Sequence, residues 1–303
     1  MDRLAVYKSL HTNIDLLKSN GIPIGGDYIC PLCMKHFSEA DVRQSMTEED
    51  VPQHSLGGER ITITCRTCNS TCGSDIDIHL YNAIKIKEQQ MFLPHTDRKV
   101  HIEKDGERLN ATLKIDDNQN TTLHIDTKRN SPRTWSMFQD NILLPNAMIS
   151  VADHPLKHSE RRISSAIIKN AYLLLFAKTG YTFLADQYYD ILREQIFDPE
   201  RYLLPERLWT AQEIMVKDGI YITQDNRYRG FFVVYTLSLK LTYKICVLIP
   251  TPSMPYLFVA KELQKISAGD SIKVKELPPL DYLEDKESIS RLTKWVYGWN
   301  MDL

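Results

Sequence analysis

The sequence of 303 residues has no excess of charge of either sign, since 37 Lys and Arg face 39 Asp and Glu. Any contact with nucleic acid must therefore be local or shared with a partner. No apolar run reaches the roughly 18 residues of a transmembrane helix, and the first residues do not follow the order of a signal peptide. A P-loop, a dinucleotide-binding fingerprint, internal repeats and low-complexity tracts are also absent. We expect a soluble, cytoplasmic protein without membrane contact, long enough for one large or two modest domains.

Cysteine is scarce, and four of the six cysteines form two Cys-x-x-Cys pairs, Cys30/Cys33 and Cys65/Cys68. Each short pair can bend two thiolates onto one metal ion, and two pairs complete a tetrahedral zinc site. Two disulfides are the alternative, but a chain without a secretory leader is expected in a reducing compartment, where cysteines stay reduced. The spacing therefore predicts a structural zinc ion. Cys72 is expected to pack beside it.

The segment around these pairs has its own order of elements. Apolar residues at three- and four-residue spacing predict an amphipathic helix over residues 4–17, which an Asn-Gly pair ends. A loop at 49–58 precedes a strand at 61–64, and a helix is predicted at 75–92, after the second cysteine pair. The order is thus loop, strand, zinc pair and helix.

This order resembles the HNH endonuclease family, whose ββα-metal unit is often braced by a four-cysteine zinc site. The resemblance rests on Cys-Pro-Leu-Cys at 30–33, on Gly57-Gly58, and on Thr-Cys-Arg-Thr-Cys-Asn at 64–69. It covers residues 27–80. In this family a divalent ion polarises the scissile phosphate and a histidine generates hydroxide. The resemblance therefore implies a phosphodiester hydrolase that acts on DNA and uses Mg²⁺ or Mn²⁺.

Carried over residue by residue, the resemblance puts the acidic ligand of the catalytic ion at Glu49 and its helix ligand at Asn69. The family's histidine position falls on Asp50. An unperturbed aspartate has a pKa near 3.9, against about 6.5 for histidine, and is a much weaker base at neutral pH. Either Asp50 binds the metal, or the base has moved to His54. A loop histidine that only supports a metal ligand is an equal interpretation of His54.

Three further side chains near the module have expected roles. Arg60 stands where the family has its middle Asn, and it is a candidate phosphate contact. Asp75 and Asp77 follow the zinc pair closely. Because residues two apart on a helix point to different faces, a metal ion shared by these two carboxylates is not expected. We interpret both as structural, with Asp77 a candidate for supporting a metal ligand.

The sequence pattern of the remaining chain predicts both helices and strands. The further predicted elements are strands at 99–103, 110–115 and 121–126, a connector at 132–146, a strand at 149–151, helices at 163–178, 186–196 and 205–217, and strands at 220–223, 231–240, 242–249 and 256–260. The predicted class is α+β. An N-terminal helix plus HNH-like zinc module occupies 1–93, a β meander 94–131, and a larger α+β domain with a mostly antiparallel sheet 132–303.

A group of basic side chains surrounds the start of the predicted helix at 163–178. Its members are His154, His158, Arg161, Arg162 and Lys169. Two interpretations stay open for this group. It forms either the solvated start of a helix or a contact with the DNA backbone.

Two functions remain open from the sequence. The first is a metal-dependent HNH-type endonuclease acting on DNA in bacterial defence against foreign DNA, with a possible protein partner in the same system. The alternative is a catalytically inactive zinc module that binds DNA or protein. Glu49 and Asn69 favour the nuclease, whereas Asp50 and Arg60 favour the binding module. Because polar metal-site residues are costly to keep for scaffolding alone, the sequence favours the nuclease.

Overall fold

The structure is a computed structural model. It describes residues 1–104, 106–125, 127–139, 147–151, 156, 158–205, 208–211, 216–223, 225–266, 271–299 and 303, without the side chains of residues 137, 139 and 211. The predicted α+β class is confirmed, and the sheets are antiparallel. Among the described helices, none combines the length and the apolar character that a membrane crossing requires.

The chain divides into two compact units. Unit 1 comprises residues Met1–Tyr81 and His158–Leu303, and unit 2 comprises Asn82–Lys157. This division differs from the predicted boundaries, because the cysteine-bearing segment packs with the C-terminal elements. Buried tyrosines make the connection: the hydroxyl of Tyr172 donates to the carbonyl oxygen of Pro31 at 2.9 Å. Unit 1 is therefore built from both ends of the sequence.

Unit 1 begins with α1 (Arg3–Ser19), which corresponds to the predicted first helix. The Asp2 carboxylate accepts a hydrogen bond from the backbone N–H of Leu4 at 2.9 Å and so caps the helix. The short strands β1 (Tyr28–Ile29) and β2 (His36–Phe37) form a hairpin that carries the first cysteine pair. Helix α2 (Glu39–Ser45) follows and leads into the next hairpin.

The second hairpin consists of β3 (Met46–Val51) and β4 (Glu59–Cys65), joined through a 3₁₀ turn at His54–Leu56. Its register shifts between Glu49 and Asp50. Strand β4 runs directly into α3 (Arg66–Cys72), a π-helical turn (Gly73–Asp77) and α4 (Ile78–Gln90). The order of elements in this segment is thus strand, strand, helix.

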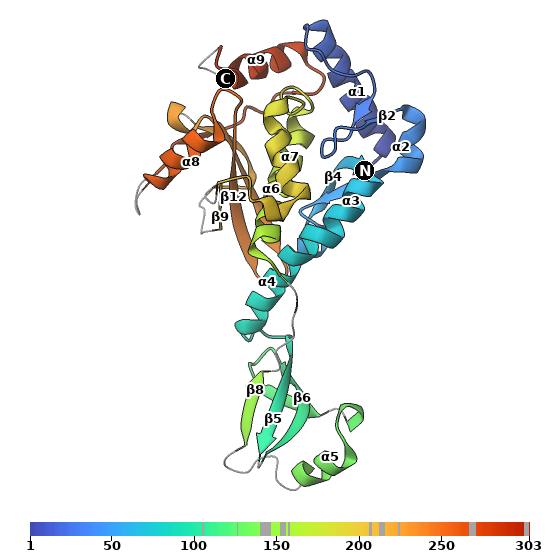
Figure 1. Cartoon of the computed structure of the whole chain (residues 1–303), viewed down its shortest axis with the longest axis vertical. Helices are drawn as coiled ribbons and strands as arrows, with labels where there is room; N and C mark the ends of the chain where they lie inside the picture. Colours follow the sequence, from blue (N-terminus) through green and yellow to red (C-terminus); the bar gives the residue numbers. More distant parts are fainter. Residues whose placement is uncertain are drawn as a thin grey trace. The chain divides into compact units, whose positions relative to one another are not determined.

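The central helix of unit 1 is α6 (Glu160–Thr179), which contacts both the β3–β4 hairpin and the C-terminal sheet (Figure 1). Its buried residues fall on all sides, as Ala166, Ile167 and Leu173 illustrate. A helix that is apolar all round belongs in a core. Helix α7 (Asp190–Phe197) packs against α6.

The C-terminal part of unit 1 contains a five-stranded antiparallel sheet with the order β13-β10-β11-β12-β9. Its strands are β9 (Trp209–Ala211), β10 (Gly219–Thr223), β11 (Gly230–Ser238), β12 (Thr242–Pro250) and β13 (Val274–Glu276). Helices α8 (Tyr256–Gln264) and α9 (Lys286–Val296) accompany the sheet. Short 3₁₀ turns lie at Gln187–Tyr189, Pro199–Arg201 and Asn226–Tyr228.

Unit 2 is a four-stranded antiparallel sheet with the order β7-β6-β5-β8. The strands are β5 (Asp97–Lys104), β6 (Glu107–Ile115), β7 (Thr121–Ile125) and β8 (Met148–Val151). A 3₁₀ turn (Thr127–Arg129) and α5 (Pro132–Gln139) lie between β7 and β8 in the sequence. Alternate residues of β5 and β6, with Phe138 of α5, form its apolar core. The strands predicted at 99–103, 110–115 and 121–126 correspond to β5, β6 and β7.

Three local predictions are wrong. Residues 132–139 form helix α5 instead of a connector, because Phe138 and Trp135 pack on the sheet. Residues 209–211, predicted as helical, form the edge strand β9, while residues 206, 207 and 212–215 of that predicted helix lie outside the described residues. Residues 256–264 form helix α8 instead of a strand at 256–260. The buried residues Tyr256, Val259 and Ala260 follow helical spacing.

Candidate metal centre and the acidic site beside it

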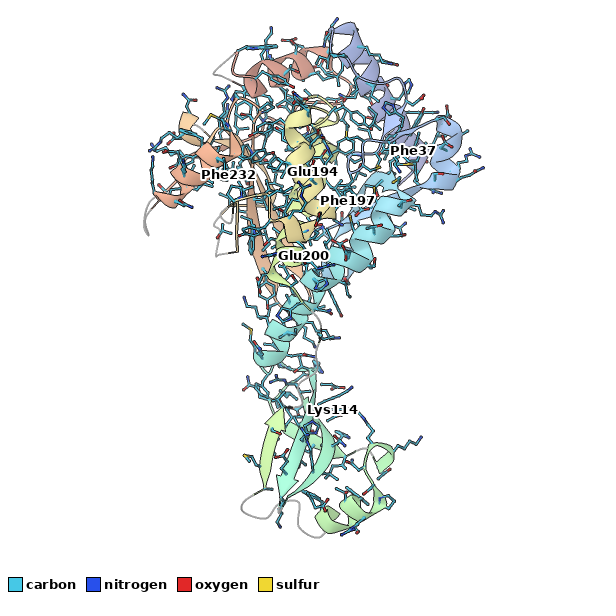
Figure 2. All side chains as sticks on the ribbon, in the orientation of Figure 1. Phe37, Lys114, Glu194, Phe197, Glu200 and Phe232 are labelled. Atoms are coloured by element: carbon cyan, nitrogen blue, oxygen red, sulfur yellow. The ribbon has the colours of Figure 1, made fainter. Side chains whose placement is uncertain are left out.

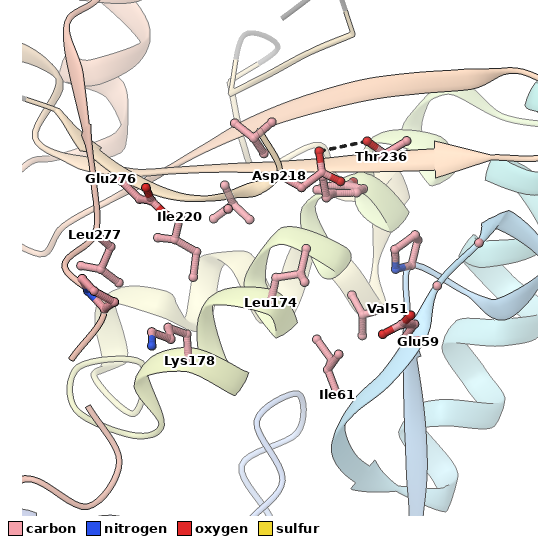
Figure 3. Close-up of a pocket in the computed structure, with 18 residues that line it drawn as sticks. Val51, Glu59, Ile61, Leu174, Lys178, Asp218, Ile220, Thr236, Glu276 and Leu277 are labelled. Carbon is pink, nitrogen blue, oxygen red and sulfur yellow. Dashed lines mark hydrogen bonds between the residues drawn. The ribbon is translucent and has the colours of Figure 1, made fainter. Parts of the chain in front are cut away.

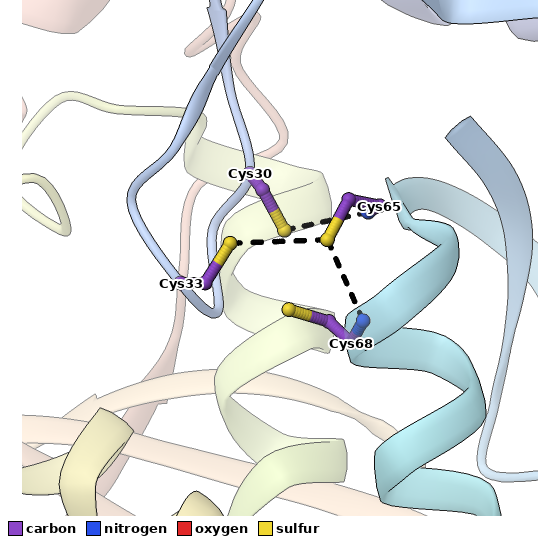
Figure 4. A group of neighbouring side chains, drawn as sticks. All are labelled: Cys30, Cys33, Cys65 and Cys68. Atoms are coloured by element: carbon purple, nitrogen blue, oxygen red, sulfur yellow. Dashed lines mark hydrogen bonds between the residues drawn. The ribbon is translucent and has the colours of Figure 1, made fainter. Parts of the chain in front are cut away.

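The four cysteines of the two pairs come together at the junction of two elements (Figure 4). Cys30 and Cys33 lie at the turn between β1 and β2, where the backbone N–H of Met34 donates to the carbonyl of Cys30 at 2.9 Å. Cys65 ends β4, and Cys68 lies in the first turn of α3. All six cysteines of the chain are free thiols. The disulfide alternative is therefore wrong for this structure.

The cysteine geometry fits a tetrahedral metal ion. The four sulfur atoms lie within 4.8 Å of one another, and Cys33 Sγ and Cys65 Sγ are 3.8 Å apart. Zn–S bonds of about 2.3 Å at tetrahedral angles place sulfurs about 3.8 Å apart. Backbone N–H groups of Cys65 and Cys68 donate to Cys30 Sγ and Cys65 Sγ, each at 3.4 Å, and such bonds orient metal-binding thiolates. A zinc ion bound here would tie β4 and α3 to the first hairpin.

Hydrogen bonds among the four sulfurs lower the pKa of two of the cysteines, and the resulting thiolates attract a cation. Hydrogen bonding from the Cys30 thiol lowers the pKa of Cys65 to about 6 and also lowers the pKa of Cys33. Hydrogen bonding to Cys33 and burial raise the pKa of Cys30. Hydrogen bonding to Cys30 lowers the pKa of Cys68, but hydrogen bonding to Cys33 and burial outweigh this and raise it. Thiolates that attract thiol protons at this spacing also attract a metal ion.

Glu49 lies in a buried acidic site formed by β3, β4, the π turn and α6. The Nζ atom of Lys169, on α6, is 3.0 Å from Glu49 Oε1 and 2.6 Å from Asp77 Oδ2. The Lys169 side chain is 0% exposed, and those of Glu49 and Asp77 are 4% and 8% exposed. The second Glu49 oxygen accepts a hydrogen bond from the Thr64 hydroxyl at 2.8 Å. Both oxygens of Glu49 are therefore engaged inside the protein.

The charges of this buried site stabilise one another. Burial lowers the pKa of Lys169, but the carboxylates of Asp77 and Glu49 outweigh it and raise that pKa above its usual value. Burial raises the pKa of Asp77, and the Lys169 ammonium opposes this shift. Lys169 is therefore an ammonium ion at neutral pH. It provides a positive charge where the sequence predicted a divalent metal ion.

Asn69 lies next to β3, the strand that carries Glu49, but its side chain does not bond to Glu49. Its side-chain amide donates to Thr47 Oγ1 and to the carbonyl oxygen of Glu48, each at 3.0 Å. These bonds tie the first turns of α3 to β3. Within the residues that the structure describes, the four cysteines are the one group of three or more His, Cys, Asp or Glu side chains placed to hold a single ion.

Asp50, Arg60 and His54 lie at the more open end of the hairpin. Arg60 is 2.6 Å from a carboxylate oxygen of Glu48 and 3.8 Å from one of Asp50. These pairs are half-exposed, and His54 in the 3₁₀ turn is exposed. Arg60 thus already neutralises two acids, and a phosphate contact would compete with them.

The group of basic side chains at the start of α6 divides between two environments. Arg162 forms an ion pair with Asp75 of the π turn, and Arg161 Nη1 is 3.3 Å from Glu200 Oε2. These two are partly or largely exposed, but Lys169 is fully buried, so its assignment to a solvated helix surface or a DNA contact is wrong. A lysine inside a helix that is apolar all round had to have a buried anion as partner. His154 lies outside the described residues.

Close contacts explain why two glycines occupy the hairpin loop. Gly57 has a φ of +85°, in the left-handed region that favours glycine, and a Cβ there would lie 3.1 Å from Cβ of Ser238. A Cβ on Gly58 would lie 1.4 Å from the carbonyl oxygen of Pro52. The loop that carries His54 is therefore fitted against strand β11.

A cavity of about 480 Å³ lies between this loop, α6 and the C-terminal sheet (Figure 3). Its walls are largely apolar, and Glu59, Asp218 and Glu276 add carboxylates. Asp218 accepts a hydrogen bond from the Thr236 hydroxyl at 2.9 Å. Lys178 is the cation in its lining. Three acids against one base disfavour a phosphate group, so we do not expect nucleic acid to bind in this cavity.

Comparison of the chain with protein-family models, with curated proteins and with solved structures finds no significant match.

Proposed function

We propose that the chain is a DNA-binding protein built on a zinc-braced ββα module of the HNH type, and that this module does not hold a catalytic ion at Glu49. The order β3, β4, α3 and the four cysteines support the resemblance to the HNH family. The observation that carries the proposal is the Lys169 ammonium between Glu49 and Asp77. A role in defence against foreign DNA, with a protein partner, belongs to the same proposal by family analogy.

A divalent ion at Glu49 would have to displace this ammonium. The displaced lysine would then lie in the core without an anion, which is strongly unfavourable. The neighbouring acids are also paired with protein cations: Glu48 with Arg60, and Asp75 with Arg162. The acidic site therefore supplies its own counter-charges. Binding, and not hydrolysis, is the function that this arrangement supports best.

Positive charge available to DNA lies on the elements that carry or connect the two cysteine pairs. Lys35, Arg43 and Arg66 are exposed and come from the β1–β2 hairpin, α2 and α3. The acids of α2, Glu39 and Asp41, lie in its first turn, at the opposite end from Arg43. A local basic surface of this kind can bind phosphate although the chain as a whole carries a charge of −2.

An HNH-type endonuclease is the second candidate. Asp50 and His54 are compatible with it, because both remain reachable by solvent at the open end of the hairpin. In this alternative Mg²⁺ or Mn²⁺ would bind with Asn69, and Asp50 or His54 would act as the base. The catalytic role of Glu49 would then require that Lys169 move away.

One experiment separates the two candidates. Zinc-loaded protein is incubated with single- and double-stranded DNA in Mg²⁺ or Mn²⁺, and binding and strand cleavage are both measured. We expect binding without cleavage. Cleavage that Asn69→Ala abolishes while zinc stays bound would refute the proposal in favour of the nuclease. Loss of that cleavage as pH falls through about 6.5 would then implicate a histidine base, and persistence to about pH 5 a carboxylate or metal hydroxide.

A further inference from the structure

A second cavity, of about 560 Å³, opens beside the four cysteines, and we call it the zinc-side pocket. Three parts of unit 1 form it: the β1–β2 hairpin, the junction of α2 and α3, and the last residue of α7. Among the residues that the structure describes, its lining contains Lys35, Arg66 and three of the cysteines, but no carboxylate. A zinc ion with four thiolates carries a formal charge of −2, which Lys35 and Arg66 offset. Unlike the cavity next to the hairpin loop, this pocket therefore offers a phosphate two exposed cations without an excess of acids.

Two aromatic rings complete the lining. Phe37 ends β2 and Phe197 ends α7, and both are half-buried, so part of each ring is accessible (labelled in Figure 2). Hydroxyl and amide groups also line the cavity, on Ser45, Thr67, Thr71 and Gln44. Aromatic side chains next to cations and hydrogen-bonding groups are the combination by which proteins bind unpaired bases and their phosphates.

We propose that the zinc-side pocket binds an unpaired nucleotide of single-stranded DNA, with a phosphate at Lys35 and Arg66 and the base against Phe37 and Phe197. This inference rests on the proposed DNA-binding function and names the form of DNA that this surface selects. A base that is paired and stacked within a duplex cannot enter a cavity without leaving the helix. Single strands are therefore preferred to duplexes.

The side chains that carry this proposal are not metal ligands, so their replacement leaves all four cysteines in place. Lys35 uses its backbone carbonyl, not its ammonium, to accept from the N–H of Cys30 at 2.9 Å. Arg66 donates from its guanidinium to the carbonyl of Gln44 at 3.2 Å, at an exposed position. Phe197→Leu keeps an apolar side chain and removes the ring. Lys286→Gln, at an exposed position of α9, is the matched control.

The test measures binding of zinc-loaded, full-length protein to a fluorescent oligo-dT of about 15 nucleotides, to a duplex of equal length, and to dTMP as competitor. We expect tighter binding of the single strand. Lys35→Gln with Arg66→Gln should weaken it at least roughly tenfold and reduce the magnitude of the slope of log K against log salt by about 0.7, because one phosphate contact is lost. Phe197→Leu should weaken it roughly fivefold without changing the slope. Lys286→Gln should stay within about twofold of wild type.

Several outcomes would overturn the inference. If the Lys35/Arg66 variant loses zinc but retains its affinity for DNA, these cations serve only to offset the thiolate charge. If wild type binds DNA and no pocket variant matters, DNA binds elsewhere, and the proposed function stands without this pocket. Effective competition by dTMP would show that the ligand is a free nucleotide. Binding of neither DNA form would refute the proposed function itself.

Discussion

Replacing Lys169 by Met tests whether the buried ammonium holds the acidic site together. The substitution keeps a long side chain but leaves the carboxylates of Glu49 and Asp77 buried without their counter-charge. Removing one partner of a buried ion pair typically costs about 3–5 kcal/mol. With an m-value of about 2 kcal/mol per molar urea, the midpoint of unfolding should fall by about 2 M. Fluorescence of Trp295, buried in unit 1, reports the transition.

The control is Lys178→Met on the same helix, where the lysine is exposed. The Lys178 ammonium donates to the carbonyl oxygen of Leu280 at 3.1 Å at an exposed position, so that change should lower the free energy of unfolding by no more than about 1 kcal/mol. Adding Glu49→Gln and Asp77→Asn to Lys169→Met should recover part of the loss, because neutral amides replace the unpaired charges. Equal midpoints for Lys169→Met and wild type at pH 8 would refute the reasoning.

The pH dependence of Lys169→Met follows from the same charges. Burial already raises the pKa of Asp77, and without the ammonium nothing opposes that shift. The folded variant then binds more protons than the unfolded chain between the unfolded pKa, about 4, and the raised one. Its stability should therefore fall as pH rises through that window. A variant that becomes more stable from pH 5 to pH 8 would contradict this sign.

Four further predictions concern the cysteines and the units. Purified protein should carry one zinc ion per chain by elemental analysis, and Cys65→Ser should unfold or aggregate unit 1, whereas a full-length, folded variant without metal would refute the zinc site. Zinc binding at pH 7 should release protons in a weakly buffered indicator assay and weaken as pH falls through about 6, where Cys65 gains its proton; affinity independent of pH would contradict this. Burial raises the pKa of Cys72 and of Cys246 to about 12, so neither should react quickly with a thiol reagent at pH 8 in folded, zinc-loaded protein. After proteolysis within unit 2, fragments carrying residues 1–81 and 158–303 should stay associated, and their separation on gel filtration would refute the shared core.

The cysteine spacing and the periodic segments determined the local structure. Two Cys-x-x-Cys pairs need only short-range geometry to present their sulfurs, and the structure brings all four together. The helices at 4–17 and 163–178 carry apolar periodicity strong enough to fix their type, and α1 and α6 span them. At Gly58 the close contact is also local, because a Cβ there would meet the backbone of Pro52, whereas the contact at Gly57 is with the remote Ser238.

Segments with competing signals were decided by packing. Residues 256–260 are apolar enough for a strand, but Val259 packs inward from a helix against Leu248 and Tyr228. Residues 132–139 form too short a segment for periodicity to fix their type, and the packing of Phe138 on the sheet stabilises them as a helix. Such choices depend on surfaces that are remote in sequence, and propensity does not encode them.

The acidic site was decided by tertiary structure alone. Glu49 and Asp77 lie 28 positions apart in the sequence. Their partner Lys169 follows unit 2 in the sequence and is 120 residues from Glu49. Nothing local distinguishes a lysine that meets two buried carboxylates from one that faces water. The difference arises only when α6 inserts between the β3–β4 hairpin and the C-terminal sheet, because burial there makes an ion pair necessary. The sequence by itself determined a cluster of four cysteines that can hold a metal ion, and the long-range packing of α6 determined which cation Glu49 holds.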